Sequence, residues 1–160
     1  MNEIFILLGA NLGKPEDQLN DARRLLNERL GKIISSSSLY KSEAWGVEDQ
    51  PVFLNQVLLI NTNYTAEDAL EICQQIENKL GRVRKEKWGA RLIDIDILYF
   101  NSQIIKLDHL IIPHPFIQDR KFTLLPLVEI AAQYIHPIFN QSNEQLLLNC
   151  KDKLNVLKLA

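Results

Sequence analysis

Two aspartates, Asp94 and Asp96, interrupt the apolar run LIDIDIL at residues 92–98. Successive side chains of a β-strand point to opposite faces, so both carboxylates would share one face, roughly 6–7 Å apart. Aspartate is a poor strand former, and at about 6 Å with an effective dielectric of about 20 the two charges repel by about 3 kcal/mol. A divalent cation would offset that repulsion. Magnesium is typically held by one or two carboxylates and substrate phosphates, so the pair predicts a metal–nucleotide site.

A strongly basic segment leads directly into the aspartates. Residues 79–91 hold six Lys or Arg and one Glu, a local charge of +5 in a chain whose net charge is −2. Arginine forks pair with phosphate oxygens, and phosphoryl transfer depends mainly on positioning and charge neutralisation. The plainer alternative for this segment is a solvated charged loop. For the aspartates it is a solvated polar strand face that Arg91 or Lys87 neutralises. The basic residues are Lys79, Arg82, Arg84, Lys85, Lys87 and Arg91.

Three other segments carry residue types that could contact a ligand. Phe53 and Asn55 would share a strand face that suits a flat, hydrogen-bonding heterocycle; the alternative is a core ring and an amide that satisfies a turn. His114 stands between two prolines in a stiff extended segment ahead of Arg120, although a single histidine is more often structural. Residues 9–13 are rich in glycine but lack the Lys-Ser/Thr ending of a P-loop.

Hydrophobic patterning predicts the elements that position these residues. Strands are expected at 4–8, 33–45, 53–61 and 92–100, with a hairpin arm at 103–105. Helices are expected from Pro15 to Leu30, from the N-cap Thr65 to Leu80, and around 124–132, with Gly31 and Gly81 ending the first two. The order β-α-β-β-α-β predicts an α+β, ferredoxin-like sandwich: an antiparallel sheet with helices on one face, plus a C-terminal extension. The sequence from Gln133 on is the least informative.

Bulk properties favour a globular protein over a nucleic-acid or membrane binder. The chain has 160 residues, which predicts a single domain over 1–160, with 46% hydrophobic and 24% charged residues. A net charge of −2 and a pI of about 5.9 argue against nucleic-acid and membrane-surface partners. No segment resembles a signal peptide or a membrane span. Cys73 and Cys150 form no CxxC motif, and Cys73 would be a small buried side chain, so we expect a reduced, cytoplasmic protein.

Together these segments resemble a known enzyme family. Residues 82–98 are similar to the signature of 6-hydroxymethyl-7,8-dihydropterin pyrophosphokinase (HPPK), an enzyme of folate biosynthesis. Residues 9–13, 49–55, 113–115 and 120–122 are similar to further blocks of that family, in the same order along the chain. The resemblance extends from Gly9 to about Ala131.

The resemblance implies a reaction, two magnesium ions and a set of contacts. Pyrophosphate would pass from ATP to the hydroxymethyl group of 6-hydroxymethyl-7,8-dihydropterin, giving the pterin diphosphate and AMP in tetrahydrofolate biosynthesis. A monomer would bind these two partners, and Asp94 and Asp96 would bridge two Mg²⁺. The implied catalytic residues are Arg82, Arg91, Asp94 and Asp96; the pterin contacts are Ser42, Trp45, Gly46, Phe53, Asn55 and Phe122; and the ATP contacts are Gln74, Glu77, Arg84, Lys85, Trp88, Arg91, Ile97, His114 and Arg120.

The chain departs from the family pattern at two places. The basic loop between Arg84 and Trp88 is one residue shorter than in some members, which bears on how the loop closes over ATP. Residues 41–46 replace a more Pro-rich pterin-side segment, and Trp45 would reshape the pocket wall. No general base is evident, and activation of the hydroxyl by metal would make one unnecessary.

Two other classes of protein share the element order. An RNA-recognition module stacks bases on the aromatic residues of an RNP1 motif, which this chain lacks. A ligand-sensing module without catalysis would leave the aspartate pair and the basic segment without a function. Magnesium-dependent formation of AMP from ATP separates the pyrophosphokinase from both.

Overall fold

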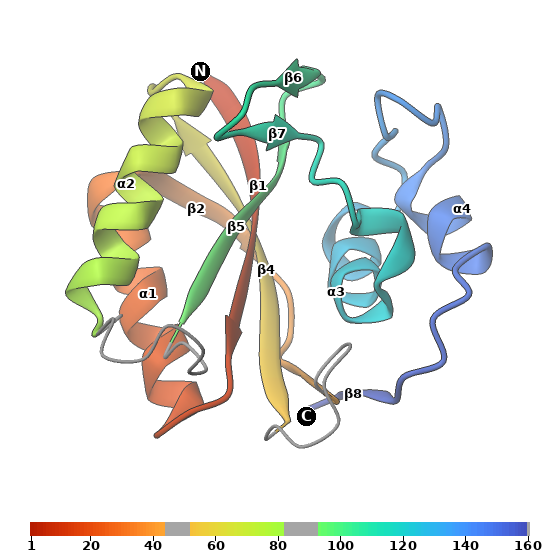
Figure 1. Ribbon diagram of the computed structural model, residues 1–160, viewed down its shortest axis with the longest axis horizontal. Coiled ribbons are helices and arrows are strands. Elements are labelled where there is room, and N and C mark those ends of the chain that lie inside the picture. The colour runs from red at the N-terminus through yellow and green to blue at the C-terminus, as the bar shows by residue number, and fades with distance from the viewer. Residues whose placement is uncertain (44–51, 82–92, 160) are drawn as a thin grey trace.

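The computed structural model describes residues 1–43, 52–81 and 93–159. Its centre is an antiparallel sheet with the strand order β5-β1-β4-β3-β8, in which β2 also pairs with β4 (Figure 1). The strands of this sheet are β1 (Asn2–Ala10), β2 (Gly31–Ser36), β3 (Tyr40–Ser42), β4 (Phe53–Thr62), β5 (Asp94–Phe100) and β8 (Val156–Lys158). The helices are α1 (Pro15–Arg29), α2 (Ala66–Lys79), α3 (Lys121–Ala131) and α4 (Asn143–Leu148). The strands β6 (Ile105–Lys106) and β7 (Ile111–Ile112) form a hairpin, and the 3-10 helix η1 (Ile117–Asp119) precedes α3.

This arrangement confirms the α+β fold class and the order β-α-β-β-α-β, with the second strand divided into β2 and β3. The helices α1 and α2 pack on one face of the sheet (Figure 1). Their apolar stripes meet alternate residues of the strands, such as Ile4, Ile6 and Leu8 of β1, in one buried cluster. Cys73 of α2 belongs to this cluster, as expected for a small apolar side chain.

The expectation that helices cover one face only is wrong. The helices α3 and α4 lie on the other face of the sheet (Figure 1). There they bury Phe5, Leu7, Val57 and Tyr99 in a second apolar cluster. Since β1 is buried at every position from Ile4 to Ala10, both of its faces must be covered. The helices α3 and α4, which follow β5 in the chain, cover the second face.

Local sequence signals explain where the helices begin and end. Pro15 occupies the start of α1, and Thr65 caps α2 by accepting a hydrogen bond from the N–H of Asp68 at 3.2 Å. Gly81 follows α2 with φ of 96°, a left-handed conformation that favours glycine. Gly31 was expected to end the first helix, but in the structure it is the first residue of β2. A Cβ there would lie 1.9 Å from the carbonyl oxygen of Asn61 on β4.

Two of the strands that carry candidate residues differ from the expectation, β1 in its length and β5 in its register. β1 extends to Ala10, beyond the Leu8 end expected, so Gly9 is a strand residue. In β5 the register with β1 shifts so that Ile6 faces Ile97 but Phe5 faces Tyr99. The extra residue in β5 lets Leu98 and Tyr99 both join the cluster beneath α3.

Among the described residues, no helix combines the length and the apolar character that crossing a membrane requires.

Candidate active site

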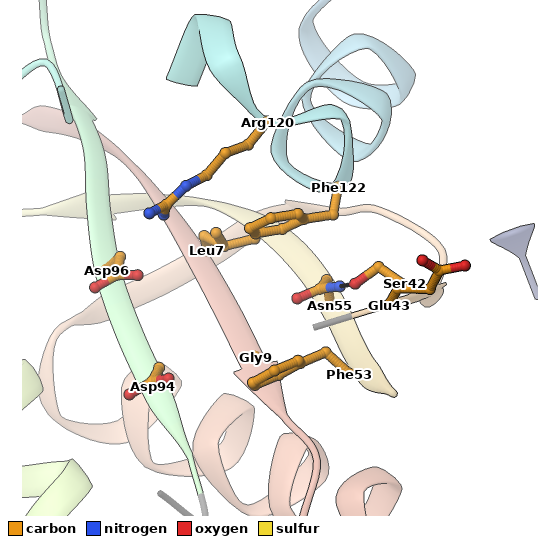
Figure 2. Close-up of a pocket in the computed structure, with 10 residues that line it drawn as sticks. All are labelled: Leu7, Gly9, Ser42, Glu43, Phe53, Asn55, Asp94, Asp96, Arg120 and Phe122. Carbon is orange, nitrogen blue, oxygen red and sulfur yellow. Dashed lines mark hydrogen bonds between the residues drawn. The ribbon is translucent and has the colours of Figure 1, made fainter. Parts of the chain in front are cut away.

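A pocket of about 160 Å³ opens on the sheet face that carries α3, and the beginning of that helix contributes to its lining. Residues on or next to β1, β3, β4, β5 and the beginning of α3 form its walls (Figure 2). The lining residues are Leu7, Gly9, Ser42, Glu43, Phe53, Asn55, Asp94, Asp96, Arg120 and Phe122. Carboxylates and a guanidinium group therefore share one cavity with two aromatic rings and an amide.

The pairing register of β1 sets the distance between the two ends of this pocket. Gly9 is the Cα partner of Asn55 on β4 and of Asp94 on β5. Two residues away, Leu7 is likewise the partner of Asp96. Neighbouring strands lie about 4.8 Å apart, so the amide and the first carboxylate are separated by roughly 10 Å across β1.

Gly9 keeps the middle of the pocket open. A Cβ at this position would lie 3.3 Å from Oδ1 of Asn55 and 3.9 Å from Cδ1 of Phe53. The first distance is tighter than ordinary packing allows, so the amide would have to move. Glycine at this position therefore leaves the Asn55 amide undisturbed where the two ends of the pocket meet.

The two aspartates project from β5 on the pocket side, which confirms that they share a face. Ile95 and Ile97 point the other way and are 5% and 6% exposed in the core. Beneath the pair, the buried Glu77 of α2 accepts a hydrogen bond from the N–H of Ile95 at 2.9 Å. This contact fixes the main chain between the two carboxylates.

The donor chemistry of the pair fits a hard cation. Within the described ranges, no group of three or more His, Cys, Asp or Glu could hold a metal ion. Two carboxylates alone match the way magnesium is bound, because that ion keeps waters and takes further oxygen ligands from substrate phosphates. Asp94 and Asp96 would thus hold the metal only together with a phosphate-bearing ligand.

Arg120 brings positive charge to the carboxylate end of the pocket. Its side chain extends from the beginning of α3 toward Asp96 (Figure 2). Burial lowers the pKa of its guanidinium, while the nearby Asp96 and Asp119 act in the opposite direction. The guanidinium carbon lies 4.8 Å from the ring centre of Phe116 and 5.6 Å from that of Phe122. These rings hold the cation in place.

His114 is fixed beside Arg120 by two backbone hydrogen bonds. Its N–H donates to the carbonyl oxygen of Leu98 at 2.9 Å, and its Nδ1 accepts from the N–H of Phe116 at 3.1 Å. Burial, helped by the charge of Arg120, lowers the pKa of His114 to about 4. The imidazole is therefore neutral at pH 7, and because Nδ1 accepts, the ring proton resides on Nε2.

The opposite end of the pocket combines an oriented amide with two rings. Asn55 is 2% exposed, and its Nδ2 donates to Oγ of Ser42 at 2.7 Å. Phe53 comes from the start of β4 and Phe122 from α3, on opposite sides of the Asn55 side chain in Figure 2. Phe53 and Asn55 share a strand face, as the alternation predicted.

Residues 5–132 match the family model of 7,8-dihydro-6-hydroxymethylpterin-pyrophosphokinase (HPPK). The chain belongs to the HPPK family. Members of this family are pyrophosphokinases of folate synthesis that use ATP as co-substrate. The family resemblance expected from the sequence is confirmed.

Relatives in bacteria carry the name 2-amino-4-hydroxy-6-hydroxymethyldihydropteridine pyrophosphokinase. The HPPK of Bacillus subtilis is 44% identical over 135 residues, which cover 83% of this chain and 81% of that protein. The Haemophilus influenzae HPPK is 39% identical over 134 residues, or 83% of this chain and 84% of that protein. The folic acid synthesis protein FOL1 of Dictyostelium discoideum is 39% identical over 97% of this chain but only 23% of its own length.

Solved structures of HPPK-DHPS proteins share the fold. One in complex with substrates superposes with a TM-score of 0.73 at 17% identity, over 92% of this chain and 43% of that one. A Plasmodium falciparum HPPK-DHPS with pterin and p-hydroxybenzoate gives 0.73 at 19%, again over 92% and 43%. The chain thus spans less than half the length of these proteins, and at such identities the likeness concerns the fold alone.

The structure gathers most of the described HPPK candidates into one place. Four described candidates lie outside the pocket lining. Gln74 is exposed on α2, Glu77 is buried beneath β5, Ile97 has its side chain in the core, and His114 lies beside Arg120. A contact of Ile97 with ATP would have to come from its main chain. The candidates Ser42, Phe53, Asn55, Asp94, Asp96, Arg120 and Phe122 all line the pocket. Trp45, Gly46, Arg82, Arg84, Lys85, Trp88 and Arg91 lie outside the described residues.

Three lining residues were not among the candidates: Leu7, Gly9 and Glu43. Alternation along β1 could have revealed the first two, because they share a face on the strand that separates the amide from the aspartates. Glu43 follows the last residue of β3, inside the segment 41–46 that the family resemblance assigns to the pterin side, although its side chain was not named as a contact.

Proposed function

We propose that this chain transfers pyrophosphate from ATP to the hydroxymethyl group of 6-hydroxymethyl-7,8-dihydropterin, producing the pterin diphosphate and AMP. The observation that carries the proposal is the register across β1. It places Asn55 and the aspartate pair on one sheet face, roughly two strand spacings apart. A flat acceptor at one end would thus meet a metal-bound triphosphate at the other.

The pterin would lie between Phe53 and Phe122. The Asn55 amide has two N–H groups and one donates to Ser42, so one N–H and Oδ1 are available to the heterocycle edge. Flat rings stack well on aromatic side chains, and an oriented amide then fixes the rotation of the ring. Together these contacts would direct the hydroxymethyl group toward Asp94 and Asp96.

The triphosphate would occupy the carboxylate end. Asp94 and Asp96 would hold two Mg²⁺, which supply charge neutralisation at the phosphates and lower the pKa of the acceptor hydroxyl. Arg120 would donate to phosphate oxygens, and the Nε2–H of neutral His114 would do the same. Glu77 would act from beneath by fixing β5. The exposed Gln74 and the main chain of Ile97 would contribute to binding ATP from the same side.

In the proposed transfer, one bond forms and one bond breaks at the β-phosphorus of ATP. The hydroxymethyl oxygen forms a bond to the β-phosphorus of ATP, and the bond from that phosphorus to the oxygen bridging to the α-phosphate breaks. AMP leaves with that oxygen, and the hydroxyl proton passes to solvent. The residues of this chain position the two reactants and stabilise charge, which is the main catalytic contribution in phosphoryl transfer.

The remaining assignments rest on the family resemblance. Arg82 and Arg91 would act on the phosphates during transfer, and Arg84, Lys85 and Trp88 would contact ATP from the basic loop. Trp45 and Gly46 would complete the pterin slot. We also propose that residues 1–160 form a single pyrophosphokinase domain that acts as a cytoplasmic monomer.

The position of the transferred label tests the proposal. The pterin is incubated with Mg-ATP labelled at the β-phosphorus, and the products are separated. Pyrophosphoryl transfer carries the label to the pterin and leaves unlabelled AMP. Transfer of a single phosphoryl group would leave the label in ADP, and that result would refute the proposal. Addition of EDTA should stop the reaction, and excess magnesium should restore it.

A further inference from the structure

The C-terminal segment of residues 150–159 lies beyond the part of the chain that the HPPK family model matches. It leaves α4, passes the beginning of α3, and ends as β8 against β3 (Figure 1). We propose that this segment is a strap that fixes the pterin-side wall of the active site. The inference rests on the proposed function, because it assigns the wall to the pterin.

The strap first contacts the N-terminus of α3. Oδ2 of Asp152 accepts a hydrogen bond from the N–H of Lys121 at 3.0 Å, and Oδ1 accepts from Leu154 at 3.0 Å. The helix's own N-cap residue, Arg120, provides no side-chain cap, so Asp152 supplies one from 31 positions away. A carboxylate there satisfies an N–H of the first turn and favours the helix dipole. That turn carries Phe122, whose ring lines the pocket.

The strap next forms the edge of the sheet. Val156 of β8 is the Cα partner of Ser42 on β3, and Ser42 is in turn the partner of Phe53 on β4. The hydroxyl of Ser42 accepts the hydrogen bond that orients Asn55. Without β8, the three-residue β3 would be an exposed edge strand, and short edges fray. Pairing with β8 therefore stabilises the residue that sets the amide.

Two further contacts join the strap to the same wall. Nδ2 of Asn155 donates to Oε1 of Glu43, a lining residue, at 3.3 Å. Glu129 of α3 accepts a hydrogen bond from the hydroxyl of Tyr40 on β3 at 2.6 Å, and its Oε1 lies 3.9 Å from Nζ of Lys158. The strap, β3 and α3 are thus connected to one another around the pterin slot.

The position of the strap predicts which substrate its loss affects. β8 and β5 lie at opposite ends of the strand order, so the β8 end of the strap is remote from the aspartates. Asp152 contacts Lys121, the residue after Arg120, and is therefore nearer to the phosphate end. Asp152 and Asn155 are therefore positioning residues for Phe122 and Glu43. Their removal should weaken pterin binding much more than ATP binding, because Phe122 and Glu43 line the pterin slot and only Asp152 adjoins Arg120.

Steady-state kinetics of strap variants test this inference. The double variant D152A/N155A, the milder D152N and the control K153A are compared with the unmodified protein; Lys153 is an exposed strap residue. We expect the KM for the pterin to rise about tenfold in the double variant and about threefold in D152N, while the KM for ATP stays within twofold. K153A should match the unmodified protein. Thermal melts accompany each assay, and D152N carries the comparison should the double variant not fold.

Two outcomes would overturn the inference. An unchanged pterin KM in folded variants would show that the strap does not reach the site. Equal rises in both KM values, or a loss of kcat alone, would show that it only stabilises the fold. Absence of pterin-dependent AMP release from the unmodified protein and K153A would instead refute the proposed function, and the strap's role with it.

Discussion

Glu77 of α2 and Ile95 of β5 are joined by a hydrogen bond of 2.9 Å, from the main-chain N–H of Ile95 to Oε2 of the buried carboxylate. Ile95 stands between Asp94 and Asp96 on the edge strand of the sheet. An edge strand offers N–H groups that no neighbouring strand satisfies. Glu77 satisfies one of them at the point where the chain must present two carboxylates in a fixed geometry.

Replacement of Glu77 should therefore affect stability and catalysis together. Glu77→Ala leaves a buried N–H without this acceptor, which costs about 1–3 kcal/mol of unfolding free energy. We also expect a higher magnesium concentration for half-maximal activity, because β5 loses its fixed position. Glu77→Gln keeps an acceptor oxygen and should lose less of both. Urea unfolding and magnesium titrations of AMP release measure the two effects; equal losses in Ala and Gln variants would contradict the positioning role.

Asp96→Ala should abolish turnover and leave the fold intact. Its carboxylate faces the pocket rather than the core, so no packing is lost, while the proposed metal site loses one of two ligands. We expect kcat at saturating Mg-ATP to fall by about a hundredfold to a thousandfold, the effect of removing a group that stabilises transition-state charge. Turnover near that of the unmodified protein would refute the metal role, and circular dichroism verifies the fold.

Gly9→Ala should impair use of the pterin. The added Cβ would approach Oδ1 of Asn55 to 3.3 Å and displace the amide from its place beside Ser42. We expect about a fivefold to tenfold rise in the pterin KM, consistent with the loss of about one hydrogen bond. Ala10→Gly is the matched control, since it changes the next residue of β1 on the opposite, core-facing side. Unaltered pterin kinetics in the Gly9 variant would contradict the geometry.

Acid should destabilise the C-terminal layer through His136. This histidine is 2% exposed, and its Nδ1 accepts from the N–H groups of Ile138 and Phe139. Burial lowers its pKa from 6.5 to about 4, so the unfolded chain binds the proton more readily. The stabilisation is complete above about pH 6.5 and is lost as the pH falls toward 4, by at most about 1.4 kcal/mol per pH unit.

The variant His136→Gln isolates this contribution from that of His114, whose pKa is shifted in the same direction. We expect its unfolding free energy to fall less steeply between pH 6.5 and pH 4 than that of the unmodified protein. Urea denaturation at several pH values gives both curves. Parallel curves would show that His136 does not titrate in this range.

Structural features that depend on residues close together in the sequence could be predicted from it. The alternation around Asp94 and Asp96 correctly placed both on one face, because a strand's period of two needs no knowledge of its neighbours. The N-cap at Thr65 was readable for the same reason, since the cap and the N–H it satisfies are three residues apart. Both predictions depend only on local geometry.

Contacts between residues far apart in the chain could not be predicted from the sequence. The place of Gly9 between Asn55 and Asp94 depends on the register of three strands separated by about forty residues each. The cap that Asp152 gives α3 joins residues without any sequence pattern, and the second helical layer follows from burial of β1 on both faces. Strand register and the packing of helical layers depend on the whole chain, so these relationships became visible only in the structure.

Release of AMP from Mg-ATP, measured with and without 6-hydroxymethyl-7,8-dihydropterin, tests the account most directly. It examines both ends of the pocket at once, because AMP forms only when the acceptor beside Asn55 meets the triphosphate beside Asp94. We predict AMP in stoichiometric amounts with the pterin diphosphate, and none when either the pterin or magnesium is omitted. A folded protein that releases no AMP with all components present, or that releases it without the pterin, would contradict the account.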